Sequence, residues 1–124
     1  EFSLFRRAPE TNGLLAACRE LGVAVVAWSP MGDGRLCAPP ERRAALPGDV
    51  RRCLDTVAQV AGRRGKSHAQ VALNWCLCKG TIPLAGTSKQ RNMESNAGAL
   101  GWRLTGEEVA ELDAVALQDQ GTFP

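Results

Sequence analysis

The spacing of hydrophobic positions predicts helices that alternate with two short strands. Residues 10–21 repeat apolar side chains at helical intervals, whereas residues 23–28 and 81–86 are short continuous apolar runs. A continuous run, rather than an alternating one, is typical of a parallel strand that is covered on both faces. The positions that fall on one face of the first helix are Leu14, Leu15, Cys18 and Leu21.

Further helices are expected after the first strand and after the second. The start signals are Asp49 as a possible N-cap and two capping boxes, Ser67 with Gln70 and Thr105 with Glu108. The predicted helices span about 49–61, from 67 to the Cys76–Cys78 region, from the end of the second strand to about 99, and within 104–117. The face of the first of them carries Val50, Leu54, Val57 and Ala61. The body of the helix after Ser67 is apolar on most sides, so it should be well buried.

Residues 29–48 are rich in glycine and proline and predict a long loop. Loops of that length inside a compact domain are usually functional or disordered. Cys37 lies in this loop and is the thiol that we expect to react first if it is exposed. Trp75, Trp102 and Phe2 are interpreted as packing residues, and His68 as an exposed residue at a helix start.

The order of strands and helices indicates parallel β/α units and one α/β domain over residues 1–124. Two parallel strands leave unpaired edges and cannot make a self-sufficient sheet. Residues 1–5 have the character of the end of a further strand. We therefore expect the chain to form part of a barrel.

Composition and charge exclude several function classes. The 124 residues include 15 basic and 13 acidic side chains, a net charge of +2, with no basic stripe. This balance gives no reason to expect a nucleic-acid partner. No apolar run approaches the roughly 20 residues that a membrane span requires, so no membrane partner is expected.

Five cysteines, an odd and scattered number, predict free thiols in a reducing compartment. We therefore expect a cytoplasmic protein, with a plastid as the alternative because a transit peptide would lie upstream. Cys76 and Cys78 point to different faces of a helix, and no nearby histidine completes a tetrahedral set. No metal site is expected.

The motifs "GLLAACRELGVAVVAWSPMGDG", "KSHAQVALNWCLCKGTIPLAGTSKQRNMESNAGAL" and "LTGEEVAELD" occur in this order. Together they resemble the C-terminal part of aldo-keto reductases, with plant or algal members the most similar. The resemblance implies an eight-stranded (β/α)8 TIM barrel that binds NADP(H), of which this chain would supply about strands 7–8, helices 6–8 and a terminal helix. The family's catalytic Asp, Tyr, Lys and His lie in the first half of the barrel. No catalytic residue is assigned here, and the chain contains no tyrosine.

The turn after the second strand is the first candidate site. A helix N-terminus offers free N–H groups and a partial positive charge to an anion. Gly86 permits close approach, Thr87 and Ser88 add hydroxyls, and Lys89 adds a full charge. From the residues alone, simple helix capping by Thr87 or Ser88 is the favoured alternative. The resemblance reverses this preference and implies a site for the 2′-phosphate of NADP.

The helix after this turn is implied to bind adenine. Asn96 matches the family residue that hydrogen-bonds the adenine edge, and Asn92 or Arg91 would lie nearby. The family usually has an acidic residue directly before that asparagine. Here Ser95 takes that place and Glu94 is one position earlier, which departs from the pattern.

The end of the first strand is the second candidate site. The resemblance implies that Trp28 stacks on the nicotinamide and that Ser29, Met31 and Gly32 begin a loop over the pyrophosphate. The alternative is that Trp28 is a core residue. Asp33 departs from the family, and because a carboxylate repels a pyrophosphate, we expect it to point away or to weaken binding.

The resemblance implies the cofactor-binding portion of an NADP-dependent reductase of aldehydes or ketones, which is inactive as this chain alone. Its partners would be a small carbonyl substrate and the N-terminal half-barrel. Residues 29–49 and the C-terminal tail would shape the substrate pocket. The alternatives are a catalytically silent binding or regulatory relative, and a non-functional fragment.

Overall fold

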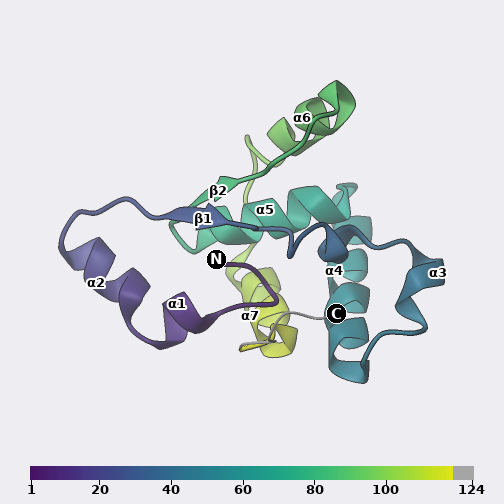
Figure 1. Cartoon of the computed structure of the whole chain (residues 1–124), viewed down its shortest axis with the longest axis horizontal. Helices are drawn as coiled ribbons and strands as arrows, with labels where there is room; N and C mark the ends of the chain where they lie inside the picture. Colours follow the sequence, from purple (N-terminus) through teal and green to yellow (C-terminus); the bar gives the residue numbers. More distant parts are fainter. Residues whose placement is uncertain (119–124) are drawn as a thin grey trace.

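The computed structural model describes residues 1–118, and the predicted contribution of the C-terminal tail falls largely outside them. Helices surround a small parallel sheet (Figure 1). In chain order the elements are α1 (Ala8–Thr11), α2 (Leu14–Glu20), β1 (Val26–Trp28), the 3-10 helix η1 (Arg35–Cys37), α3 (Pro40–Arg43), α4 (Gly48–Arg64), α5 (His68–Cys78), β2 (Ile82–Leu84), α6 (Gln90–Ala97) and α7 (Gly106–Val115). None of the helices within residues 1–118 is both long enough and apolar enough to cross a bilayer.

β1 and β2 pair in parallel, as predicted, although both strands are shorter than the apolar runs that contain them. The crossover between them runs through α3, α4 and α5, which makes a β/α unit. On the other edge of β1, the backbone N–H of Phe2 donates to the carbonyl of Trp28 at 3.2 Å. The N-terminal segment therefore lies beside the end of β1.

The prediction that both faces of the strands are covered is wrong for this chain. Ala27 is buried against the helices, but its neighbours Val26 and Trp28 are 57% and 58% exposed. The register pairs these two with Ile82 and Leu84 of β2, which are exposed to a similar degree. Because side chains alternate along a strand, the helices cover one face and leave a four-residue apolar face open.

The hydrophobic core lies between α4, α5 and α7. The predicted apolar face of α4 is confirmed, since Val50, Leu54, Val57 and Ala61 are all buried. α5 is buried around most of its circumference, also as predicted. Trp75 stacks on Phe2 with ring centroids 5.0 Å apart, which confirms the packing role of both rings.

Polar contacts reinforce this packing. Lys79 at the end of α5 binds Glu10 of α1 at 2.8 Å and Asp113 of α7 at 2.6 Å. Trp75 donates its ring N–H to the other carboxylate oxygen of Asp113 at 2.8 Å. One aspartate therefore joins the C-terminal helix to α5, and Lys79 extends the link to α1.

The single helix expected over residues 10–21 is instead two helices. Gly13 adopts a φ of 87°, and the chain restarts at Leu14, whose N–H is accepted by the side chain of Asn12 at 3.0 Å. Gly13 supplies the left-handed conformation without steric cost. Only Leu15 of the expected apolar face is buried, while Leu14 and Leu21 are exposed and Cys18 is half-buried.

The segment predicted as a loop, 29–48, contains η1 and α3. Pro40 occupies the first position of α3, where its fixed φ suits a helix start. The prediction of Asp49 as N-cap is also wrong, because α4 begins at Gly48 and Asp49 lies in its first turn. Its carboxylate accepts the N–H of Val50 at 2.8 Å instead.

Both predicted capping boxes are confirmed. Ser67 with Gln70 starts α5, and Thr105 with Glu108 starts α7, each with reciprocal side-chain and backbone hydrogen bonds. Glu108 also forms two hydrogen bonds with Arg64 of α4, at 2.7 and 2.6 Å. The end of α4 is therefore paired with α7.

Candidate functional site

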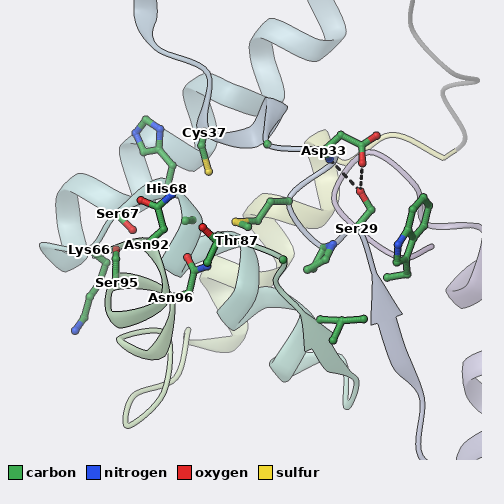
Figure 2. Close-up of a pocket in the computed structure, with 17 residues that line it drawn as sticks. Ser29, Asp33, Cys37, Lys66, Ser67, His68, Thr87, Asn92, Ser95 and Asn96 are labelled. Carbon is green, nitrogen blue, oxygen red and sulfur yellow. Dashed lines mark hydrogen bonds between the residues drawn. The ribbon is translucent and has the colours of Figure 1, made fainter. Parts of the chain in front are cut away.

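A cavity of about 900 Å³ lies at the carboxyl ends of β1 and β2 (Figure 2). It is lined by four segments that the fold brings together: the end of β1 with the loop after it, the start of α5, the end of β2 with the turn after it, and one side of α6. Parallel β/α units commonly place functional residues at this end of their strands.

Seven of the ten predicted site residues line the cavity, and three do not. Those that line it are Trp28, Ser29, Met31, Gly86, Thr87, Asn92 and Asn96. Gly32, Ser88 and Lys89 are outside the lining. Gly32 is buried with a φ of 56°, and a Cβ there would lie 2.6 Å from the Phe5 ring, so it shapes the loop from behind.

The loop after β1 is held by a compact hydrogen-bonded turn. The Ser29 hydroxyl donates to the Asp33 carboxylate at 2.6 Å and accepts the Asp33 backbone N–H at 3.0 Å (Figure 2). Both residues have positive φ, 51° and 56°, which is uncommon for non-glycine residues. Asp33 lines the cavity, and its carboxylate is held on Ser29.

Trp28 lines the cavity and is largely exposed. The indole is 58% exposed, so its alternative interpretation as a core residue is wrong. Its ring contributes flat apolar surface to the lining, to which the half-buried Met31 also belongs. Exposed aromatic surface at the mouth of a cavity is suited to stacking on a planar ligand.

The start of α5 forms a wall that the sequence did not reveal. Lys66, Ser67, His68 and Ala69 line the cavity there. His68 is half-buried, contrary to the expectation of an exposed side chain. Arg43 of α3 lies 3.1 Å from its Nδ1, and because a guanidinium only donates, Nδ1 is the acceptor.

Burial first, and the positive charge of Arg43 second, lower the pKa of His68 below its ordinary value of 6.5. His68 is therefore neutral at pH 7, with its proton on Nε2. The signal that could have located this wall is the capping box at Ser67. This capping box fixes the start of α5. Once α5 is known to belong to the crossover of a parallel β/α unit, its start is expected near the carboxyl ends of the strands.

The interpretation of Thr87 or Ser88 as the cap of the helix after β2 is wrong, because the N-cap of α6 is Lys89 and no side chain caps it. Gly86 and Thr87 line the cavity. The Thr87 hydroxyl also accepts the backbone N–H of Lys89 at 3.1 Å, so it organises the entry to α6. Lys89 itself is the N-cap of α6, is exposed, and lies next to the lining.

α6 presents Asn92, Ser95 and Asn96 to the cavity (Figure 2). Ser95 was noted in the sequence only as a departure from a pattern, and its place in the lining was missed. Glu94 lies outside the lining, and its carboxylate accepts a hydrogen bond from Gln90 at 2.8 Å. Glu94 therefore brings no carboxylate to this wall, whereas Ser95 belongs to its lining.

Cys37 also lines the cavity and is exposed. Partial burial of its thiol raises its pKa above the ordinary value of 9.0, so the thiolate fraction is small at pH 7. Within the part of the chain that the structure describes, no group of three or more His, Cys, Asp or Glu side chains could hold a metal ion. The five cysteines are free thiols.

A second, smaller cavity of about 260 Å³ lies between α2 and the approach to β1. Leu15, Cys18, Val23 and Lys79 are among the residues around it. None of the predicted site residues lines it. It can therefore serve as a negative control for ligand binding at the larger cavity.

Comparisons with known proteins agree with this architecture. The chain is 37% identical to the chloroplastic pyridoxal reductase of Arabidopsis thaliana over 128 aligned positions, which cover 94% of this chain and 35% of that protein. A thermostable aldo-keto reductase crystallised with the inhibitor epalrestat superposes with a TM-score of 0.74 at 27% identity, covering 93% of this chain and 38% of that one. The aldose reductase of Schistosoma japonicum, at 22% identity, gives the same TM-score over 98% of this chain and 34% of its own, and supports the fold alone.

The chain thus spans about a third of the length of these relatives. The structural matches confirm the predicted fold class, part of a (β/α)8 barrel. The model of the aldo/keto reductase family matches residues 1–117, which is nearly the whole chain. The chain belongs to the aldo/keto reductase family.

Proposed function

We propose that this chain is the cofactor-binding portion of an NADP-dependent aldo-keto reductase that reduces aldehydes or ketones. The observation that carries the proposal is the cavity at the strand ends, which gathers seven of the ten residues expected to contact NADP. Its volume of about 900 Å³ is at the large end of the range for ligand pockets, as a dinucleotide requires.

The residues that line the cavity offer groups suited to the two ends of the cofactor. Trp28 and Met31 would hold the nicotinamide end, because both offer polarizable apolar surface. Asn92 and Asn96 would bind the adenine end, since side-chain amides both donate and accept hydrogen bonds as the adenine edge requires. The loop at Ser29 and the turn at Gly86 line the same cavity and would contact the part of the cofactor between its two rings.

The 2′-phosphate would bind at the start of α6. Thr87 lines the cavity there, and the exposed ammonium of Lys89 is two residues away on a flexible stem. The N-terminus of α6 adds its dipole. Lys66 also lines the cavity, but its ammonium lies over the Trp102 ring, 5.3 Å from the ring centroid, so Lys89 is the cation assigned to this phosphate.

Bound NADPH would supply the hydride, and the residues of this chain would bind and orient it. The general acid would come from the remainder of the barrel, because this chain has no tyrosine. We therefore expect no reductase activity from the 124 residues alone. NADPH consumption with simple aldehydes by the purified chain would contradict this expectation.

The open face of β1 and β2 indicates which partner this chain would bind. Val26, Trp28, Ile82 and Leu84 form an exposed apolar surface where a barrel has its interior. We propose that the other strands of the barrel cover it. Static light scattering on the isolated chain should then show association, which addition of the N-terminal half-barrel suppresses; a monodisperse monomer would count against this pairing.

The test of the cofactor assignment compares NADPH with NADH. Fluorescence titration of the protein should show NADPH binding more tightly by at least about tenfold, the contribution of one charge-assisted contact to the extra phosphate. Lys89→Ala should remove most of that difference and change NADH binding little. Arg51→Ala, which removes an exposed cation from α4, is the matched control. Equal affinities for the two cofactors would overturn the 2′-phosphate assignment.

A catalytically silent binding or regulatory relative that keeps the cofactor site is the second candidate. Such a protein would bind the dinucleotide and turn nothing over. Turnover of an aldehyde by the longest natural form of the protein would exclude this candidate. Cofactor binding without turnover would favour it.

A further inference from the structure

α6 carries much of the proposed adenine site but buries none of its own side chains. All residues from 90 to 97 are exposed or half-buried, and Met93 is 60% exposed. Figure 1 shows the helix projecting from the body of the molecule beyond α5. Because little apolar area is removed from water, burial of α6 side chains does little to hold this helix in place.

Gln70 of α5 supplies one connection, and both ends of its amide are used. Its Oε1 accepts the backbone N–H of Ser67 at 2.9 Å, which starts α5. Its Nε2 donates to the backbone carbonyl of Ser95 in α6 at 2.8 Å. Gly98 leaves room for this contact, since a Cβ there would lie 2.4 Å from Nε2.

Asn74, one turn further along α5, supplies the second connection. It is fully buried, and its Nδ2 donates to the carbonyls of Ala99 at 2.8 Å and Trp102 at 2.9 Å. Its Oδ1 accepts the N–H of Leu104 at 2.9 Å. Asn74 therefore fixes the segment that follows α6 to the core, where Ala99 and Leu104 of that segment are buried.

We propose that Gln70 and Asn74 are positioning residues that fix α6 against α5 and thereby hold Asn92 and Asn96 at the cavity. Residues i and i+4 share one face of a helix, so the two amides form a single row facing α6 and the segment after it. Neither lines the cavity. The inference rests on the proposed function, because it assigns to α6 the adenosine end of the cofactor.

The first test is Gln70→Glu. A carboxylate keeps the acceptor that Ser67 needs and removes the donor to Ser95, so α5 should start unchanged while α6 loses its tether. Gln59→Glu adds the same charge at an exposed site on α4 and is the matched control. Hydrogen exchange of the α6 amides should become about fivefold faster in Gln70→Glu, the effect of one hydrogen bond, and stay unchanged in Gln59→Glu.

The second variant, Gly98→Ala, tests the same contact without a charge. The added methyl would displace the Gln70 amide from Ser95, and Gly98 has a helical φ that alanine also adopts. Gly106→Ala, at a position with open space, is its control. The predicted exchange pattern is that of Gln70→Glu.

The ligand readout uses adenosine 2′,5′-bisphosphate, the adenosine half of NADP, and nicotinamide mononucleotide, the other half. Both tether variants should bind the adenosine half about fivefold more weakly and the nicotinamide half unchanged. A general loss of stability would weaken both halves together. That result would overturn the positioning role.

The exchange measurement needs no ligand, so the two proposals can fail separately. If the wild-type protein binds neither half, the proposed function fails. Faster exchange confined to α6 would still establish the tether. Unchanged exchange of α6 in both Gln70→Glu and Gly98→Ala would overturn the inference whatever the ligand result.

Discussion

Two regions of the molecule differ in how much side-chain surface they bury. One is formed by helices α4, α5 and α7, and the other by β1, β2 and α6. The three helices enclose the core, including the fully buried Trp75. The strands leave one apolar face exposed, and α6 buries nothing. The first region stabilises the fold by packing and supplies only the start of α5 to the cavity. The second depends on a few hydrogen bonds and carries the other segments of the lining. In this chain the candidate site therefore lies on the more weakly held region, as is common for ligand-binding segments.

Each of the two regions contains a tryptophan. Replacing each of these residues by alanine should give the largest difference in unfolding free energy between the regions. Trp75→Ala removes a stacked, fully buried ring and the donor to Asp113, so we expect a loss of about 3–5 kcal/mol in the free energy of unfolding. Trp28→Ala should lower that free energy by less than about 1 kcal/mol, because the ring is largely exposed.

Urea denaturation monitored by circular dichroism measures both effects. For NADPH affinity the order should reverse, with Trp28→Ala weakening binding about tenfold through lost stacking. Equal destabilisation by the two substitutions would refute the contrast between the regions.

Removal of Asp113 should have the next largest effect. Asp113→Ala leaves the Trp75 ring N–H without its partner and leaves Lys79 with Glu10 alone, so we expect a loss of about 2–3 kcal/mol in unfolding free energy. Asp55→Ala breaks a more exposed pair with Arg43 at 3.7 Å and should cost less than about 1 kcal/mol. If the two variants unfold at the same urea concentration, the link from α7 to α5 and α1 is not the stabilising feature described here.

The smallest expected effect is a change in acid stability. Hydrogen bonding from Arg64 is the main cause that lowers the pKa of Glu108 from 4.5 to about 2. Because the folded-state pKa lies below the unfolded one, this stabilisation is present above about pH 4.5 and is lost as the pH falls toward 2. Glu108→Gln keeps the capping acceptor and should flatten the stability profile in that window, measured as urea midpoints at each pH.

Glu107→Gln, in the same first turn of α7 but exposed, is the control for this prediction. It should leave the acid profile unchanged. A profile that is equally steep in wild type and Glu108→Gln would show that the Arg64 pair contributes nothing to acid stability.

Local signals predicted much of the fold. The capping boxes at Ser67 and Thr105 were identified from four-residue patterns because the relevant hydrogen bonds are local. The parallel pairing of β1 and β2 followed from the order of elements. The break at Gly13 and the short helix α3 were missed, because a left-handed glycine and a proline at a helix start do not alter hydrophobic periodicity.

The exposed face of the sheet could not be predicted from its own residues. Val26 and Ile82 look like buried strand positions, and what covers them depends on segments that are distant in sequence. The wall at Lys66 and His68 was missed for the same reason, since only the crossover brings it to the strand ends. The residues at 28–31 and 86–96 were found through the family motifs, and the structure shows which of them share one cavity.

The measurement that tests the central claim most directly is an NMR titration of the isotope-labelled protein with NADPH. The account predicts amide shift changes confined to segments 28–37, 66–69 and 84–96, which surround the cavity at the strand ends. Amides around the smaller cavity, at residues 15–25, should not move. Changes centred on the smaller cavity, or no change in 84–96, would contradict the assignment of the dinucleotide site.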